Sequence, residues 1–417
     1  MFLVNDFPYF SKIVQYNYIG GITMIKREHY IEDIRGFYDS DLIKIITGIR
    51  RCGKSIILEQ IRDELKEKTD NIIYLNFEDE SILTNISSCD ELLEYVDSNR
   101  KDGLCYVFLD EIQEVTDWAK ACKTLRLHNI SLFITGSNSK ILSKEFTNEF
   151  SGRYVSFRIR PFVYKEILEY CESSNISYSI SDYLVWGGFP KQLDFSRLED
   201  KKRYLDEIYN SIVYKDLIVR FSIKNVELFK KITNYVLRSN SRIFSGRSIE
   251  KYLKDEKVKG SINTIVKYVD YLEQAYIIDK VKTYSNSTKK ELSYYYKVYD
   301  SDVSFNSILC MDNRFDISHN LENIVYNELL YMGYVVNVFS IDGKKIDFVA
   351  FKDNKKYYIQ VAYSVADDKT YDREFRVFNN LDNSCKKILI TNDDIDYSTS
   401  VVEHIKFKDF LLMNSLD

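Results

Sequence analysis

Proline and glycine are scarce in this chain of 417 residues, which contains 3 prolines and 14 glycines. Because flexible or extended linkers are rich in these two residues, the composition argues against long linkers and low-complexity segments. Apolar runs are short as well, and none approaches the roughly 20 residues of a membrane-spanning helix. A chain of this length with 45% hydrophobic residues predicts a globular protein of two or three domains without membrane contact.

Residues that bind metals or form disulfides are few and scattered. The seven cysteines include no CxxC pair, and no histidine lies near a cysteine at ligand spacing. This pattern argues against structural zinc and favours reduced thiols in a cytosol. The first residues, MFLVNDFPYF, contain an aspartate within their apolar part and lack a basic start, so a signal peptide is not expected. We therefore expect a cytoplasmic protein.

Charge is distributed unevenly along the chain. The formal net charge is −5, but residues 201–300 carry 21 lysines and arginines against 12 aspartates and glutamates. A basic segment of this kind contacts nucleic acid in some proteins and forms a solvated helical face in others. Both interpretations stay open.

The segment from about 41 to 161 alternates short apolar runs with stretches of helical periodicity. Apolar residues recur at i, i+3 and i+4 spacing in those stretches, for example in KSIILEQIRDELKEK. Strands that alternate with helices form βαβ units, whose parallel sheet is buried on both faces. The sequence therefore predicts an α/β fold with five strands, at residues 42–48, 71–78, 104–111, 131–137 and 154–161.

The first of these strands leads into GIRRCGKS, which matches the phosphate-loop pattern GxxxxGK[ST] at every fixed position. Glycines let the loop curl so that backbone N–H groups point at phosphate oxygens. Lys54 would reach the terminal phosphates, and the Ser55 hydroxyl would bind Mg²⁺. The alternative is a glycine turn with an unrelated lysine. The expected phosphate-binding residues are Gly48, Ile49, Arg50, Arg51, Cys52, Gly53, Lys54, Ser55 and Ile56.

A second motif, CYVFLDEIQEV, places Asp110 and Glu111 at the carboxyl end of an apolar strand. Ligands bind at that edge of α/β sheets. Asp110 would join Ser55 as a Mg²⁺ ligand, and Glu111 would orient and activate the attacking water. An acidic pair on the surface is the alternative interpretation.

A third strand ends in the polar residues of LFITGSNS. In phosphate-loop sheets with a catalytic glutamate, this strand lies between the other two. Thr135, Ser137 or Asn138 would then face the γ-phosphate. Asn138 would equally serve as the cap of the helix that follows.

Taken in order, seven segments resemble the prokaryotic AAA-type ATPases that end in a nuclease-like domain, and more distantly the archaeal ATPase group. The resemblance runs from about Met24 to the C-terminus. It implies a P-loop AAA+ module, a winged helix and a small α/β domain similar to the PD-(D/E)XK nucleases. ATP, rather than GTP, is also implied by this resemblance alone. The segments are ITGIRRCGKS, FLDEIQ, ITGSNSKIL, SGRY, YLVWGGFP, LENIVYNELL and KIDFVA.

These patterns divide the chain into four regions. Residues 1–23 fit none of them, and Met24 is a second plausible start. The four regions are a P-loop AAA+ ATPase domain at 24–162, a helical region at 163–244, a winged-helix domain at 245–305 and a nuclease-like domain at 315–417.

Three arginines are candidates for contact with phosphate. Arg153, in SGRY, is a candidate finger toward the γ-phosphate of its own or a neighbouring subunit. Arg50 and Arg51 lie in the phosphate loop and would screen phosphate charge. Structural salt bridges are the alternative, which we favour for Arg50. Cys52 is expected to be a small filler, although its thiol would make the site sensitive to oxidation.

The nuclease-like domain has an incomplete catalytic pattern. Glu322 and Asp347 match its acidic positions, but the next strand reads Gln360-Val-Ala instead of (D/E)xK. A glutamine is a weak metal ligand, and an alanine cannot replace the lysine that polarises water. We therefore expect a catalytically degraded domain, unless Lys387 or Lys369 takes the place of the lysine.

The leading hypothesis is a protein that binds and hydrolyses ATP with Mg²⁺ and moves its C-terminal domains. One alternative is an ATP-regulated, Mg²⁺-dependent DNA nuclease. Another is a nucleotide-switched binding protein with little turnover. The partner is DNA, a protein or a second copy of the chain. For DNA, the expected contacts are lysines of the winged helix, namely Lys280, Lys282, Lys289 and Lys290.

Overall fold

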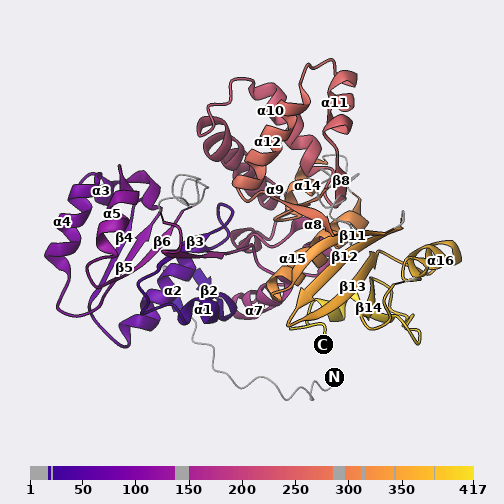
Figure 1. The fold of residues 1–417 in the computed structure, drawn as a ribbon, viewed down its shortest axis with the longest axis horizontal. Helices are drawn as coiled ribbons and strands as arrows, with labels where there is room; N and C mark the ends of the chain where they lie inside the picture. The colour runs from indigo at the N-terminus through magenta and orange to yellow at the C-terminus, as the bar shows by residue number, and fades with distance from the viewer. Residues whose placement is uncertain are drawn as a thin grey trace.

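In the computed structural model, the described residues form a two-stranded, a five-stranded and an eight-stranded sheet with surrounding helices (Figure 1). The first sheet pairs β1 (Asn17–Ile19) with β2 (Ile22–Met24). In the part of the chain that the structure describes, no helix combines the length and apolar character needed to span a bilayer. The described residues are 17–19, 22–136, 150–284, 296–310, 316–341, 344–379 and 381–417.

The five-stranded sheet has the order β4-β5-β6-β3-β7, and all of its strand pairs are parallel. All five strands coincide with the predicted apolar runs to within three residues at either end, and β6 lies between β5 and β3 as expected. The predicted α/β fold class is thus confirmed. The strands are β3 (Ile43–Thr47), β4 (Ile72–Asn76), β5 (Cys105–Asp110), β6 (Ile130–Thr135) and β7 (Tyr154–Arg158).

Helices cover both faces of this sheet, which is why β3, β5 and β6 are buried along their whole length. Ile46, Phe108 and Phe133 pack with α1 and α2 on one face, whereas Ile45 and Val107 pack with α4 and α5 on the other. The elements are α1 (Glu28–Arg35), α2 (Lys54–Lys66), α3 (Glu80–Leu83), α4 (Cys89–Asn99), the 3₁₀ turn η1 (Ile112–Glu114) and α5 (Trp118–Leu125).

The region predicted to be helical continues from the sheet and contains an unusual element. Helix α9 runs directly into η3, an eight-residue π-helix, and π-helical turns are rare and frequent at functional sites. The elements are α7 (Tyr164–Ser174), α8 (Ile180–Trp186), η2 (Pro190–Asp194), α9 (Leu198–Ser211), η3 (Ile212–Val219) and α10 (Val226–Leu237).

The eight-stranded sheet joins two regions that the sequence analysis treats as separate domains. The hairpin of β9 and β10, expected as the wing, continues into the C-terminal sheet because β9 pairs in parallel with β11. One continuous sheet therefore includes strands from both sides of the expected boundary between residues 305 and 315. Whether the two regions fold separately stays a prediction. The sheet has the order β15-β14-β13-β12-β11-β9-β10-β8.

Helices α11 (Gly246–Asp255) and α12 (Ile262–Gln274) precede the hairpin, and α15 (Ile317–Tyr331) packs against β10, β11 and β13. Figure 1 shows α15 in the middle of the molecule, between the two larger sheets. The other elements are β8 (Arg242–Phe244), β9 (Ile278–Tyr284), β10 (Tyr296–Asp300), α14 (Ser304–Leu309), β11 (Val335–Ile341), β12 (Lys344–Lys352), β13 (Lys355–Ala362), α16 (Asp368–Arg376), β14 (Lys386–Thr391), β15 (Glu403–Lys406) and α17 (Phe407–Phe410).

Candidate functional site

The loop between β3 and α2 has the backbone that a phosphate cradle needs. Gly48 and Gly53 have φ of 144° and 99°, a region that other residues rarely adopt. A Cβ atom on Gly48 would lie 2.2 Å from the carbonyl oxygen of Ile159. Gly53 immediately precedes Lys54, the first residue of α2. The loop thus ends at a helix N-terminus, where backbone N–H groups favour anions.

Lys54 folds back over this loop. Its side chain is buried, and Nζ donates to the carbonyl oxygens of Gly48 and Ile49, both at 3.3 Å. The ammonium therefore lies inside the curl of the loop, as the motif requires of the lysine that contacts the terminal phosphates.

The two predicted Mg²⁺ ligands meet beneath the loop. The hydroxyls of Ser55 and Thr135 donate hydrogen bonds to the carboxylate of Asp110. Burial raises the pKa of Asp110, and these two hydrogen bonds oppose that shift. A hydroxyl beside a carboxylate is an all-oxygen donor set of the kind that Mg²⁺ prefers, so the residues present fit this ion.

Glu111 follows Asp110 in an unusual backbone conformation. Its φ is 52°, its N–H donates to Oγ1 of Thr135 at 3.0 Å, and its carboxylate accepts a hydrogen bond from Gln113. Thr135 thus contacts both acidic residues of the motif. Ser137 and Asn138, the other two candidates on this strand end, lie outside the described residues.

Arg153 does not lie near the phosphate loop of its own chain, which corrects one of the predicted roles. The parallel register pairs Ile43 with Tyr154 and Thr47 with Arg158, so Arg153 lies at the opposite end of the sheet from Gly48. Five residues of strand span roughly 16 Å, more than an arginine side chain can bridge. A role toward a neighbouring subunit stays a prediction.

The arginines and the cysteine of the loop have different environments. Arg50 lies between two carboxylates, with Nη1 at 3.5 Å from Asp216 and Nη2 at 3.6 Å from Glu78, in agreement with the salt-bridge alternative. Arg51 is exposed. Cys52 is buried with its Sγ 3.4 Å from the Ile159 carbonyl, and burial raises the pKa of its thiol. It is a small filler beneath the loop.

Asp216, on η3, is a residue that sequence reasoning missed. Its side chain is buried, and burial raises its pKa to about 6, opposed by Arg50 and Lys54 and reinforced by Glu111. A carboxylate from the helical region therefore faces the phosphate loop. The available signal was the single acid within the apolar stretch SIVYKDLIVRF.

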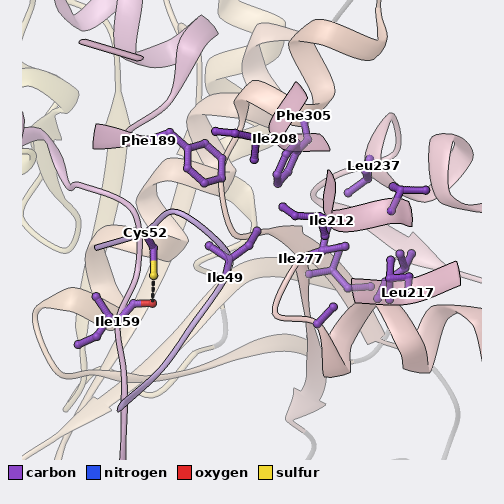
Figure 2. Packing of buried hydrophobic residues seen from close by; sticks show 14 of the residues in the cluster. Ile49, Cys52, Ile159, Phe189, Ile208, Ile212, Leu217, Leu237, Ile277 and Phe305 are labelled. Atoms are coloured by element: carbon purple, nitrogen blue, oxygen red, sulfur yellow. Dashed lines mark hydrogen bonds between the residues drawn. The ribbon is translucent and has the colours of Figure 1, made fainter. Parts of the chain in front are cut away.

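The loop is also anchored to the helical region by apolar contact. Ile49 is 1% exposed and belongs to the same buried cluster as Ile212 and Leu217 of η3. Figure 2 shows Ile49 reaching from the loop toward Ile212 and Ile277. A movement of the loop would thus displace the side chains of η3 that pack against Ile49.

Arg27, just before α1, is a second missed residue. Its guanidinium makes a bidentate ion pair with Glu166 of α7, at 2.7 and 2.8 Å, and donates to the Cys52 carbonyl at 2.9 Å. A further bond joins it to the Arg160 carbonyl. This buried cation ties the phosphate loop to α7.

A cavity of about 320 Å³ opens beside Gly53, at the start of α2. Its volume falls within the range of small-molecule sites, and much of its wall is apolar. Pro190, from the WGGFP segment, reaches this wall because Gly188 pairs closely with Phe162. The apolar and aromatic lining residues are Met24, Ile25, Ile56, Phe162, Tyr170 and Pro190.

The structure brings the three candidate nuclease residues together, but with an unexpected cation. Nζ of Lys297 lies 2.8 Å from Glu322 and 2.9 Å from Asp347, and the side chain of Gln360 accepts from the Asp347 backbone at 3.2 Å. Lys387 instead contacts Leu381 and Asn383. Among the described residues, no group of three His, Cys, Asp or Glu side chains is arranged to hold a metal. Because the Lys297 ammonium lies between the Glu322 and Asp347 carboxylates, the residues in this arrangement do not fit Mg²⁺.

Of the lysines proposed for DNA contact, Lys280 is already paired, with Asp270 at 2.6 Å and Glu273 at 2.7 Å. Lys282 is exposed on the same strand. Lys289 and Lys290 lie outside the described residues.

Comparison with known proteins identifies the family. A family model described as an AAA domain matches residues 40–168, and a domain of unknown function matches residues 177–314. An uncharacterized protein of Haemophilus influenzae is 33% identical over 379 residues, covering 88% of this chain and 94% of its own. The chain belongs to the family of that protein. The family also includes an uncharacterized protein of Methanocaldococcus jannaschii, 32% identical over 88% of this chain and 87% of its own.

The N-terminal part of the chain is therefore an AAA-type P-loop domain. An additional α/β sheet follows it in the C-terminal part. Among solved structures, the chain is similar to the replication initiator DnaA bound to AMPPCP and single-stranded DNA, with 16% identity, 59% of this chain and 86% of that chain covered, and a TM-score of 0.32. It is also similar to DnaA of Aquifex aeolicus, with 16% identity, coverage of 58% and 85%, and a TM-score of 0.29. These distant similarities carry no functional argument.

Proposed function

We propose that this AAA-domain protein binds ATP with Mg²⁺, hydrolyses it, and transmits its nucleotide state to the C-terminal sheet. The observation that supports this most is the contact between the Ser55 hydroxyl and the buried Asp110 carboxylate, next to the helix that begins with Lys54. Two oxygen ligands and an ammonium at a helix N-terminus suit a magnesium-bound triphosphate.

Each residue of the site has a distinct role in this proposal. Lys54 exchanges the Gly48 and Ile49 carbonyls for oxygens of the terminal phosphates. Ser55 and Asp110 hold Mg²⁺, which when bound neutralises charge on the phosphates during phosphoryl transfer. Glu111 orients the attacking water and takes up its proton.

The cavity beside Gly53 is the proposed site of the base. It adjoins the loop at the start of α2, and its wall offers Ile56, Phe162 and Pro190 for apolar and stacking contact. The choice of ATP over GTP follows from the resemblance of the chain to AAA-type ATPases.

An ion triad around the buried Asp279 is the proposed route from the loop to the C-terminal sheet. Arg158 and Arg160 both pair with Asp279 of β9, at 2.5 and 2.6 Å. Ile159, between the two arginines, is the residue whose carbonyl lies against Gly48 and Cys52. A shift of the loop would therefore displace the segment that holds β9, and β9 belongs to the eight-stranded sheet.

Two variants test this function separately for binding and for chemistry. Lys54→Ala is expected to abolish binding of ATP, measured by calorimetry with Mg²⁺. Glu111→Gln is expected to bind ATP like wild type but to release phosphate at least a hundredfold more slowly. A Glu111→Gln variant with the wild-type hydrolysis rate would refute the role of Glu111. Wild-type protein that binds ATP without measurable turnover would instead support the nucleotide-switched binding protein.

A further inference from the structure

Side chains from three distant elements meet in the C-terminal α/β region. Lys297 comes from β10, Glu322 from α15 and Asp347 from β12, and all three side chains are largely buried. The Lys297 ammonium lies 2.8 Å from Oε1 of Glu322 and 2.9 Å from Oδ1 of Asp347. In a metal-dependent nuclease of the fold that the sequence resembles, this pair of carboxylates would bind the metal.

We propose that the Lys297 ammonium is the permanent cation of this carboxylate site, so that the C-terminal α/β region works without a divalent metal and is held to the β9–β10 hairpin by this contact. Backbone pairing of β9 with β11 joins the hairpin to the C-terminal strands, and the contact of Lys297 with Glu322 and Asp347 adds a second link between them.

The hydrogen bonds around the site support this inference. Oε1 of Glu322 also accepts from the Tyr299 hydroxyl at 2.6 Å, and Oδ2 of Asp347 accepts from the Val361 N–H at 3.1 Å. The oxygens that face the ammonium, and the second oxygen of Asp347, are therefore already satisfied. A divalent ion would have to displace Lys297 to reach them.

Gln360, at the third position of the motif, also argues against a bound metal. The side-chain oxygen of Gln360 accepts from the backbone N–H of Asp347, and its NH₂ group donates to Glu374 at 2.7 Å. The single side-chain oxygen of Gln360 is neutral and already accepts a hydrogen bond, whereas the carboxylate of an intact motif would offer a metal two charged oxygens.

Electrostatics agree with the geometry. Burial alone would lower the pKa of Lys297, but Asp347 and Glu322 outweigh it and raise the pKa, so the side chain stays charged. Burial raises the pKa of Glu322 to about 7, with Asp347 adding to the shift and Lys297 opposing it. The ammonium, 2.8 and 2.9 Å from the two carboxylates, therefore already compensates their charge.

The test uses the full-length chain without nucleotide and Mn²⁺ as the probe, with bound Mn²⁺ counted by electron paramagnetic resonance. Wild type and Asp347→Asn are expected to bind the same number of Mn²⁺ ions. Lys297→Met is expected to gain one ion per chain, and the double variant Lys297→Met/Asp347→Asn to lose it again. Lys282→Met, which removes an exposed lysine on the neighbouring strand, is the control and should match wild type.

Two results would overturn the proposal. One is a Mn²⁺ site, or Mn²⁺-dependent DNA cleavage, that wild type has and Asp347→Asn lacks. The other is a folded Lys297→Met variant that gains no ion. If Lys297→Met fails to fold, the comparison of wild type with Asp347→Asn still decides, because it needs no change at Lys297.

Discussion

Arg50 of the phosphate loop and Asp216 of the π-helix η3 face each other at 3.5 Å, in a site where both side chains are mostly buried. The carboxylate also interacts electrostatically with Lys54 and Glu111. An internal anion thus lies beside the cations that are proposed to receive the phosphates of ATP. The negative charges of Asp216 and of the ATP phosphates would repel each other at this range. Binding of the nucleotide would therefore act on the helical region through Asp216.

The first prediction concerns the affinity for ATP. Asp216→Asn removes the buried negative charge while keeping the shape of the side chain, so ATP should bind about three- to tenfold more tightly, or roughly 0.7–1.4 kcal/mol. Calorimetry with Mg²⁺ measures this change. Asp206→Asn, at an exposed aspartate on α9, serves as the control. Equal or weaker binding by Asp216→Asn would show that Asp216 supports the site rather than opposing phosphate.

The pH dependence of that difference is the second prediction. The pKa of Asp216 is raised to about 6, so folded protein takes up a proton there as the pH falls through 6. The charged groups around it are Arg50, Lys54, Glu111 and Arg220. Protonated Asp216 resembles asparagine, so the affinity ratio of Asp216→Asn to wild type should fall toward one between pH 7.5 and 5. Because ATP itself titrates equally in both measurements, the ratio isolates Asp216, and a ratio independent of pH would contradict this assignment.

Our third prediction tests the close approach beneath the loop. Gly48→Ala should reduce ATP binding at least tenfold, because its Cβ would meet the Ile159 carbonyl at 2.2 Å and φ is 144°. Gly36→Ala is the matched control, since φ there is −63° and nothing lies within 4 Å of the added atom. Near-normal binding by Gly48→Ala would mean that the loop tolerates a different backbone.

A fourth prediction compares two arginine ion pairs for stability. Arg27→Met leaves the buried carboxylate of Glu166 without its ion-pair partner, and should lower the free energy of unfolding by about 3–5 kcal/mol. Arg35→Met removes a partly exposed arginine with equally short contacts to Glu28 and Glu64, and should cost less than about 1 kcal/mol. Urea denaturation, followed at the first unfolding transition, measures both. Similar losses would show that burial does not set the strength of the Arg27 pair.

The proposed base site yields the fifth prediction. Ile56→Trp should fill the cavity beside Gly53 and weaken ATP at least tenfold, while the affinity for inorganic triphosphate changes little. Leu198→Trp, at an exposed leucine on α9, is the control for the added ring. Equal loss of ATP and triphosphate would place the base elsewhere.

Several parts of this protein could be predicted from the sequence alone. The apolar runs that became β3, β5 and β6 are buried on both faces, so their composition was sufficient to indicate a parallel sheet. The conformation of the phosphate loop could likewise be predicted from the spacing of Gly48, Gly53 and Lys54, because a turn and a helix start are local properties of the backbone.

Other contacts depended on the tertiary structure. Arg27 pairs with Glu166 across 139 residues, and Lys297 meets Asp347 across 50. Local periodicity shows which face of an element is buried but not which element covers it. The partner of a buried charge is set by packing between elements, and for that reason Asp216, Lys297 and the true position of Arg153 emerged only from the fold.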